Sequence, residues 1–318
     1  MKLRKILSLA LALLLCVTAI STLASCSEEE KYTVGILQLV QHEALDAATK
    51  GFKDALIEEL GEDNIEFLEQ NAQGDSTTCT TIAADFVSKN VDLIMANATP
   101  ALQAAATATN SIPVLGTSVT AYDVALELDD FDGIVGGNIS GTSDLAPLDE
   151  QAEMILEFFP DAENVGLLYC SAEPNSTYQV AEITKYLEDK GVTCQNYSFA
   201  DSNDVSIVAA KAAADSDVIY IPTDNTAASC TEAINAAIGD TPVIAGEPGI
   251  CGGCGVATLG ISYYDLGVTT GKMAAKILTG EKNVSEMPIE YAPATKMYNA
   301  DKCEELGIPA PEGYDPLS

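Results

Sequence analysis

The sequence predicts an α/β protein built from two similar Rossmann-like lobes that are joined by a hinge. Each lobe would be a parallel sheet covered by helices. From residue 32 onward, short β-branched runs alternate with longer amphipathic segments, which is the pattern of parallel strands with covering helices. The first run, 34–40, is almost continuously apolar, as expected of a strand buried on both faces. A second series of the same kind begins near residue 165.

The two series resemble each other in detail. Val34-Gly35-Ile36-Leu37 is matched by Val165-Gly166-Leu167-Leu168, and Asp92-Leu93-Ile94 by Asp217-Val218-Ile219. The offsets between these matches are 131 and 125 residues. Chance similarity between two stretches of α/β sequence is the alternative, but the nearly constant offset favours one unit used twice.

The elements follow in order from the spacing of apolar residues. In the first series, Leu45, Phe52 and Leu56 recur at helical spacing after the first strand. The expected strands of this series are 34–40, 65–69, 91–96 and 113–119, and the expected helices are 45–60, 77–89 and 100–108. The second series has strands at 165–169, 192–199, 217–222 and 242–246, and helices at 148–158, 176–190, 204–214 and 227–238.

The N-terminus has the order of a secretory signal peptide. Lys2, Arg4 and Lys5 precede an apolar run at 6–20, and small residues lead to Cys26. The run is shorter than the roughly 20 residues that a membrane-spanning helix needs. We therefore expect residues 1–25 to be a signal peptide, Cys26 to carry a lipid as in a bacterial lipobox, and 26–31 to be a short lipidated leash. An ordinary cleaved signal that happens to precede a Cys is the alternative.

Composition argues against several functional classes. The chain has 318 residues, with 15 Lys plus Arg against 48 Asp plus Glu, so nucleic acid and anionic membrane surfaces are not expected partners. Arg4 is the only Arg, so a bound anion must be held by helix N-termini, hydroxyls or backbone amides. One His is present, and no dinucleotide, P-loop or G-x-S-x-G motif occurs. These observations predict neither an enzyme nor a cofactor.

The cysteines leave two alternatives open. Of nine Cys, Cys16 lies in the signal and Cys26 is the expected lipid site. Cys251-Gly252-Gly253-Cys254 is a single C-x-x-C without a second pair, so no metal site is expected. This pair is either a local disulfide or two free thiols.

Hydroxyl-rich turns follow several of the expected strands. Examples are Asn97-Ala98-Thr99-Pro100, Gly116-Thr117-Ser118, 138–144, 171–176 and 222–226. Ordinary helix capping explains each turn by itself. Because ligands bind beyond the carboxyl ends of parallel strands, these turns together predict a site in a cleft between the lobes.

These turns resemble the substrate-binding lipoproteins of ABC importers, in the family that includes tryptophan and tyrosine binders. The resemblance rests on Ala98-Thr99-Pro100, Gly141-Thr142-Ser143-Asp144, Glu173-Pro174-Asn175-Ser176, 222–226 and 259–267, and extends from about Lys31 to the C-terminus. It implies a type I periplasmic-binding-protein fold. The residues that would line the ligand cleft are Thr99, Ser118, Thr142, Ser143, Asn175, Asp224 and Glu247.

The resemblance also implies roles for these residues. Thr142, Ser143 and nearby amides would hold a carboxylate, with hydroxyl contacts from Thr99 or Ser118. Asp224, and Glu247 with it, would hold an ammonium group. His42, at a helix start, would either contact the ligand or cap the helix. Tyr122, Tyr178, Tyr263 and Tyr264 are candidate walls for an aromatic ring.

The expected function is extracytoplasmic binding of a small zwitterion, an aromatic or large apolar amino acid, for an ABC permease. The protein would be a monomer anchored by a lipid to the outer face of the bacterial cell membrane. The alternatives are a sugar, nucleoside or branched-chain amino acid as ligand, a ligand-sensing lipoprotein, or an exported hydrolase. Three crossings near Ala121, Ser262 and Ala292 would divide lobe 1 (32–120 and 263–291) from lobe 2 (121–262 and 292–318).

Overall fold

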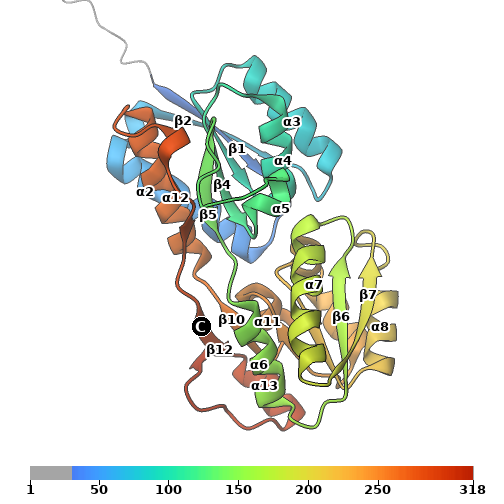
Figure 1. The fold of residues 1–318 in the computed structure, drawn as a ribbon. Helices are drawn as coiled ribbons and strands as arrows, with labels where there is room; N and C mark the ends of the chain where they lie inside the picture. The colour runs from blue at the N-terminus through green and yellow to red at the C-terminus, as the bar shows by residue number, and fades with distance from the viewer. Residues whose placement is uncertain (1–30, 318) are drawn as a thin grey trace, which may run out of the picture. The chain divides into compact units, whose positions relative to one another are not determined.

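The computed structural model describes residues 31–317, which form two lobes that each contain one sheet (Figure 1). The segments expected to be the signal peptide and most of the leash, with Cys26, lie outside the described residues. The sheet of lobe 1 has the strand order β11-β5-β4-β3-β1-β2, and that of lobe 2 has the order β13-β12-β10-β9-β8-β6-β7.

The strands of both sheets are short and mostly parallel. In lobe 1 they are β1 (Tyr32–Gln38), β2 (Ile65–Asn71), β3 (Leu93–Asn97), β4 (Val114–Val119), β5 (Ile139–Ser143) and β11 (Glu290–Tyr291). In lobe 2 they are β6 (Asn164–Cys170), β7 (Thr193–Phe199), β8 (Val218–Ile221), β9 (Val243–Ala245), β10 (Ala257–Gly260), β12 (Thr295–Tyr298) and β13 (Asp315–Pro316). The pairing of β10 with β12 is antiparallel.

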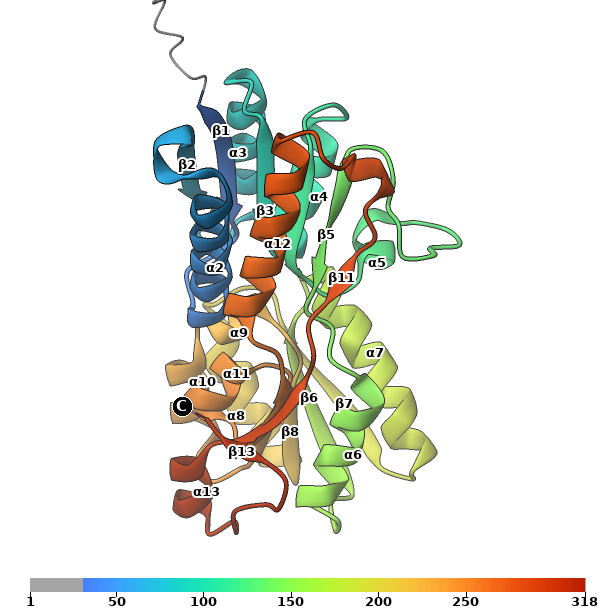
Figure 2. The same cartoon turned by 90° about the vertical axis from the view of Figure 1, so that its left-hand side faces the viewer.

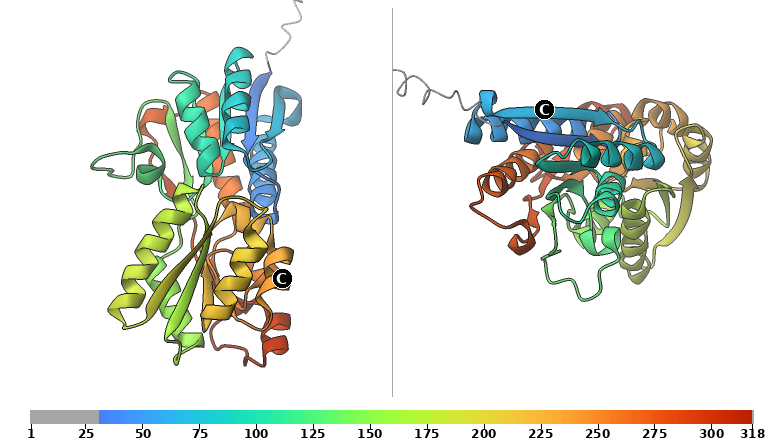
Figure 3. Two further views of the ribbon diagram at one scale, coloured as in Figure 1. Left: turned by 90° about the vertical axis from the view of Figure 1, so that its right-hand side faces the viewer. Right: turned by 90° about the horizontal axis from the view of Figure 1, so that it is seen from above.

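Helices cover both faces of each sheet (Figures 1 and 3). Those of lobe 1 are α2 (Glu43–Leu60), α3 (Ser76–Ser88), α4 (Thr99–Ala108), α5 (Tyr122–Leu126) and α12 (Tyr263–Leu278), with 3-10 turns η1 (Glu62–Asn64) and η2 (Val284–Glu286). Those of lobe 2 are α6 (Leu148–Phe158), α7 (Pro174–Asp189), α8 (Val205–Asp215), α9 (Asn225–Ala228), α10 (Thr231–Ile238), α11 (Pro248–Cys254) and α13 (Ala300–Leu306). No helix in the described range is long and apolar enough to cross a bilayer.

The sequence repeat corresponds to a structural repeat. The order β5-β4-β3-β1-β2 in lobe 1 is reproduced as β10-β9-β8-β6-β7 in lobe 2. The two matched aspartates also make equivalent hydrogen bonds. Asp92 accepts one from the backbone N–H of Thr33 at 2.7 Å, and Asp217 accepts one from the backbone N–H of Asn164 at 2.9 Å. Each carboxylate therefore fixes the start of the first strand of its own lobe.

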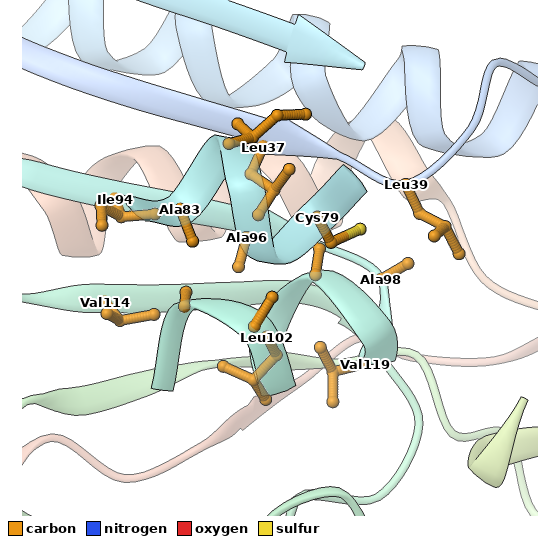
Figure 4. Close-up of a cluster of buried hydrophobic side chains, with 14 of the residues drawn as sticks. Leu37, Leu39, Cys79, Ala83, Ile94, Ala96, Ala98, Leu102, Val114 and Val119 are labelled. Atoms are coloured by element: carbon orange, nitrogen blue, oxygen red, sulfur yellow. The ribbon is translucent and has the colours of Figure 1, made fainter. Parts of the chain in front are cut away.

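The core of lobe 1 lies on both faces of its sheet. Alternate residues of each strand point to opposite faces, so Leu37 and Ile94 pack with α3 and α4 (Figure 4). Their neighbours Ile36 and Met95 pack on the other side with α2 and α12. This two-sided burial explains why the segments of β1 and β3 are nearly continuous apolar runs.

Helix α12 packs closely on α2 through glycines (Figure 2). A Cβ atom on Gly267 would lie 2.0 Å from the carbonyl oxygen of Ala48, and one on Gly51 would lie 2.1 Å from that of Tyr264. Helix α12 follows β10 of lobe 2 but belongs to lobe 1, just as α6 follows β5 of lobe 1 but belongs to lobe 2. The chain thus exchanges one helix between the lobes in each direction.

The first crossing differs from the one expected at Ala121. Strand β5 pairs with β4, and Tyr122, Ala125 and Ile139 are part of the lobe 1 core. The chain therefore leaves lobe 1 after Ser143. The segment 139–143 was expected to be a turn because its sequence Ile-Ser-Gly-Thr-Ser has almost no apolar residues. It is fully buried as a strand because its hydroxyls find partners inside the lobe.

Candidate functional site

Buried polar atoms without a hydrogen-bond partner gather where the two lobes meet. Six of the eight such side-chain atoms among the described residues come from strand-end turns or the first crossing. They are His42 Nδ1, Asn97 Oδ1, Thr99 Oγ1, Ser118 Oγ, Asp144 Oδ1 and Asn175 Oδ1. A buried polar group without a partner costs about 1–3 kcal/mol, so their concentration in one region indicates a site made for a polar ligand.

The turns of lobe 1 present open donors. Helix α4 begins at Thr99 without a side-chain cap, and its first turn contains Pro100. Its N-cap Ala98 has φ +94°, and Ser118 at the end of β4 has φ +53°. Residues other than Gly rarely adopt such angles, and the strain concentrates at functional sites. The free N–H groups and positive end of α4 suit an anion, and Thr99 Oγ1 faces the same region unpartnered.

The corresponding turns of lobe 2 are closed by carboxylates. Asp224 caps α9 by accepting the N–H of Ala227 at 2.8 Å, and its other oxygen accepts the N–H of Cys170 at 2.6 Å. Glu247 caps α11 by accepting the N–H groups of Gly249 and Ile250. Burial raises the pKa of Asp224, and it raises the pKa of Glu247 to about 7. Both candidates for an ammonium contact are thus engaged in backbone capping.

Glu173 is a further buried carboxylate of lobe 2. It precedes α7 without capping the backbone of that helix, and it accepts hydrogen bonds from Asn225 Nδ2 at 2.7 Å and from Thr226 Oγ1 at 2.7 Å. The backbone N–H groups of both residues donate to it as well. Asn175 Nδ2 donates to the carbonyl of Thr223 at 3.0 Å, and Asn175 Oδ1 has no partner in the protein. Glu173 therefore ties the α7 turn to the α9 turn.

Asp144 lies on the first crossing and is only half satisfied. Its Oδ2 accepts the hydroxyl of Tyr263 at 3.0 Å, and its Oδ1 is buried without a partner. Burial raises the pKa of Asp144 to about 6, and the negative charge of Glu173 acts in the same direction. Tyr263 belongs to the second crossing, so this pair joins two segments that cross between the lobes. The sequence did not single out Asp144 as a site residue, because its place on the crossing depends on β5 being a strand.

The buried charges of the region are one-sided. The buried carboxylates of the described chain are Asp144, Glu173, Asp224 and Glu247, and all four lie at these turns or crossings. The one buried cation in the same range, Lys302, is held elsewhere by Asn235 and Glu305. Burying carboxylates without cations is costly. Such an arrangement suits a ligand that brings its own positive charge.

Two candidate residues have internal partners instead. Thr142 Oγ1 lies 3.3 Å from Thr117 Oγ1 and 2.9 Å from Thr270 Oγ1, inside lobe 1. Ser143 donates to the carbonyl of Thr120 at 2.9 Å. The structure therefore brings Thr99, Ser118 and Asn175 to the site with unpartnered atoms, whereas Thr142, Ser143, Asp224 and Glu247 serve the scaffold.

The four tyrosines are similarly divided. Tyr122 lies in the lobe 1 core, where its hydroxyl donates a hydrogen bond to the carbonyl of Thr142. Tyr264 contacts Asp54 and Lys50 on the outer side of α2. Tyr178 is half-buried on α7. Tyr263, through Asp144, is the tyrosine that the hydrogen bonds tie to the site.

One side-chain hydrogen bond joins the lobes directly. His42 Nε2 of lobe 1 lies 3.3 Å from Asn225 Oδ1 of lobe 2. Apart from the Asp144–Tyr263 pair on the crossings, it is the one such contact between lobes among residues 31–317. His42 makes no capping bond to α2, so the capping alternative does not describe it. Burial lowers the pKa of His42.

A cavity of about 480 Å³ lies beside the crossings. It is lined by the start of α2, the start of α11, residues 260–264 and the C-terminal residues 315–317. It shares Glu247 and Tyr263 with the site, but its lining includes none of the six unpartnered atoms. We therefore place the candidate site at the facing turns and regard this cavity as a neighbouring hollow.

Cys251 and Cys254 are two free buried thiols in α11. Burial raises the pKa of the Cys254 thiol to about 12 and that of Cys251 well above its usual range. Low thiolate content makes buried thiols unreactive, so this C-x-x-C packs as part of the lobe 2 core. The structure thus selects the free-thiol alternative.

The sequence matches a family model described as ABC transporter substrate binding protein over residues 33–314. The chain belongs to this family. A curated relative, the tyrosine-binding protein of Clostridioides difficile (strain R20291), is 35% identical over 334 residues, covering 96% of this chain and 93% of that protein. Members of this family bind small molecules for ABC transporters, which places them outside the cytoplasm and among solute-binding proteins, not enzymes.

Solved structures of similar proteins share the fold. A structure described as the ABC domain in complex with L-Trp, from Streptococcus pneumoniae, has a TM-score of 0.86 at 30% identity, covering 91% of this chain and 100% of that chain. A ligand-free, open substrate-binding protein with adhesive properties from Clostridium difficile has a TM-score of 0.68 at 37% identity, covering 90% and 99%. Despite its lower identity, the L-Trp complex is the better structural match.

Proposed function

We propose that this member of the family binds an aromatic amino acid between its lobes and delivers it to an ABC permease. The observation that carries the proposal is the group of unpartnered buried atoms on both lobes, set among carboxylates that have no buried cation. The relatives that bind tyrosine and L-Trp support this ligand class.

The ligand carboxylate belongs on lobe 1. The N-terminus of α4, the hydroxyl of Thr99 and the hydroxyl of Ser118 supply donors there. A helix N-terminus favours a negative charge by about 0.3–1 kcal/mol, and more when it is partly buried. This arrangement replaces the Arg that the mature chain lacks.

The ligand ammonium group belongs beside Asp144. Its Oδ1 accepts no hydrogen bond from the protein, and Asn175 Oδ1 offers a second acceptor from lobe 2. An ammonium group there would offset part of the negative charge of the buried carboxylates. A ligand held by both lobes binds the closed state more tightly than the open one, so it shifts the population toward closure.

Calorimetry and thermal unfolding test this assignment. L-Trp and L-Tyr should bind, and ligand at 100 times its Kd should add about 2.7 kcal/mol to the free energy of unfolding. Tryptamine, which lacks the carboxylate, and indole-3-propionate, which lacks the ammonium group, should bind at least tenfold more weakly. Stabilisation by myo-inositol or a pentose, with no response to any amino acid, would overturn the proposal.

We also propose that Cys26 carries the lipid anchor. Support comes from the charged, apolar and small-residue order that precedes it. Acylation stabilises membrane association by about 0.8 kcal/mol per buried methylene. Cys26→Ala should release the protein from the membrane fraction into the medium with its ligand affinity unchanged. Membrane retention of this variant would contradict the anchor.

A further inference from the structure

We infer that His42 Nδ1 is a hydrogen-bond acceptor for the ring donor of the ligand, and that lobe 2 sets this acceptor by fixing the imidazole tautomer. The inference rests on the proposed function and deepens it. It predicts how the site distinguishes tryptophan and tyrosine, which carry a ring N–H or O–H, from phenylalanine, which carries none.

The first step is the orientation of the Asn225 amide. Its Nδ2 donates to Glu173 Oε2 at 2.7 Å. An ionised carboxylate can only accept hydrogen bonds, so the atom that faces it must be a donor. The nitrogen of the amide therefore faces Glu173. Its Oδ1 faces His42 Nε2 at 3.3 Å as an acceptor.

The second step is the tautomer of His42. Because Asn225 presents an oxygen, Nε2 must carry the proton and donate it. Burial disfavours the charged imidazole, although the carboxylates of Asp46 and Glu173 act in the opposite direction. A neutral imidazole with a proton on Nε2 has a lone pair on Nδ1. Glu173 and Asn225 are thus positioning residues for the acceptor at Nδ1.

The third step is the situation of Nδ1 itself. It is out of contact with solvent and has no partner in the protein. The backbone of α2 does not use it, since His42 makes no capping bond. The residue follows β1, whose neighbour β3 ends at the open start of α4. Nδ1 is therefore an unused acceptor on the turn after β1, at the same edge of the lobe 1 sheet as the start of α4.

The fourth step is the ligand donor. In the proposed pose, Asp144 takes the ammonium group and α4 takes the carboxylate, so the remaining donor of tryptophan or tyrosine is on the ring. Leaving a buried acceptor unpaired costs about 1–3 kcal/mol. Phenylalanine, which cannot pair it, should accordingly bind about 10- to 100-fold more weakly than tyrosine.

The chain has a single His, so nitrogen NMR of protein labelled with 15N-histidine reports on this ring without assignment. With L-Trp bound, we expect the neutral tautomer protonated at Nε2. The Nδ1 resonance should move when L-Trp, but not 1-methyl-L-Trp, is added. A proton on Nδ1, or a charged ring at pH 7, would overturn the inference.

Variants separate the acceptor from its support. His42→Gln keeps a group that can reach Asn225 but loses the acceptor at the Nδ1 position, so the preference for tyrosine over phenylalanine should fall at least fivefold. His42→Asn retains a polar atom near the Nδ1 position and should keep part of that preference. Asn225→Leu should weaken the preference, whereas Asn225→Asp, still an acceptor for Nε2–H, should preserve it. Thr142→Val, inside lobe 1, is the matched control and should leave the preference unchanged.

The outcomes distinguish the two proposals. Equal affinities for tyrosine and phenylalanine, together with equal affinities for tryptophan and its 1-methyl derivative, would overturn the role of His42 while leaving the proposed function intact. If no aromatic amino acid binds, the proposed function fails together with this role.

Discussion

The two lobes share a strand order but differ at the turns that face each other. In lobe 1, the turn from β3 to α4 has a strained N-cap, Ala98, and no side-chain cap. In lobe 2, the equivalent turn from β8 to α9 is capped by Asp224. The same scaffold therefore presents open donors on one side and satisfied carboxylates on the other.

The next pair of equivalent turns repeats this difference. Strand β4 leads to Ser118, whose hydroxyl is buried and unpartnered, whereas β9 leads to Glu247, which caps α11. In the proposed site, lobe 1 therefore receives the anionic group of the ligand, whereas the lobe 2 carboxylates are already held by backbone N–H groups. The comparison predicts that changes in lobe 1 turns alter binding, whereas changes in lobe 2 carboxylates alter stability.

The largest expected effect is on the helix pair of lobe 1. In Gly267→Ala, the added methyl would lie 2.0 Å from the Ala48 carbonyl oxygen. Overpacking of this kind costs about 1–3 kcal/mol, occasionally more, and backbone contact puts this site at the upper end. Urea unfolding should show the loss. Gly252→Ala in lobe 2, where a Cβ meets nothing within 4 Å, is the control, and an equal loss there would contradict the packing argument.

Removing a cap from lobe 2 should have the next largest effect. Asp224→Ala takes an acceptor from the N–H of Ala227 and from that of Cys170. Loss of a cap costs about 0.5–2 kcal/mol, and a second unsatisfied buried group adds to it, so unfolding should require about 2–3 kcal/mol less. Binding measured well below the melting temperature should change less than fivefold. A large loss of affinity without loss of stability would reverse the comparison.

Binding should weaken in acid. Asp144, with a pKa of about 6, must be ionised to hold the ammonium group, so affinity should fall about tenfold from pH 7 to pH 5. Calorimetry across this range measures the slope. In Asp144→Asn, affinity at pH 7 should be lower and its dependence on pH should flatten. An unchanged slope in this variant would remove Asp144 from the ammonium site.

The ligand-free protein should respond to pH in the opposite direction. Asp144 and Glu247 have raised pKa values in the folded state, about 6 and about 7. A carboxyl group whose pKa is raised by folding contributes stability that is fully present below its unfolded-state pKa. This contribution is lost as the pH rises through its folded-state pKa. The lowered pKa of His42 has the opposite effect, because it reduces stability as the pH falls below the pKa that this group has in the unfolded chain. The carboxyls outnumber it, so the melting temperature should rise between pH 8 and pH 5.

The smallest effect separates two threonines of the same lobe. Thr99→Val removes an unpartnered hydroxyl, so affinity for L-Trp should fall about fivefold with stability unchanged or slightly higher. Thr142→Val removes a hydroxyl bonded to two other threonines, so it should cost about 1 kcal/mol of stability with affinity unchanged. Thermal unfolding and calorimetry on both variants measure this crossed pattern. Equal changes of affinity and stability in the two variants would show that the turns of lobe 1 have no special role in binding.

Local patterns in the sequence were sufficient for the lobes. Apolar runs and helical spacing predicted the first four strands of each series, and the repeated aspartates at 92 and 217 indicated duplication. Strand β5 was missed because its small polar residues carry no apolar signal. The expected helix at 227–238 proved to be two, α9 and α10.

The site was predictable only as a set of turns. Thr99, Ser118 and Asn175 lie in turns whose hydroxyls and amides stood out in the sequence. Asp144 and Glu173 gain their significance from partners more than 50 residues away, Tyr263 and Thr226. No local pattern encodes such a partner.

The sequence by itself determined two α/β lobes, an acidic chain with a single Arg at position 4, and hydroxyl-bearing turns at the strand ends, because these properties depend on residue type and short-range spacing. Only the tertiary structure decided which polar atoms are left without a partner, because satisfaction of a hydrogen bond depends on what the rest of the chain brings within about 3 Å. The same two types, carboxylate and hydroxyl, became scaffold at Asp224 and Thr142 and candidate ligand contacts at Asp144 and Thr99 for that reason.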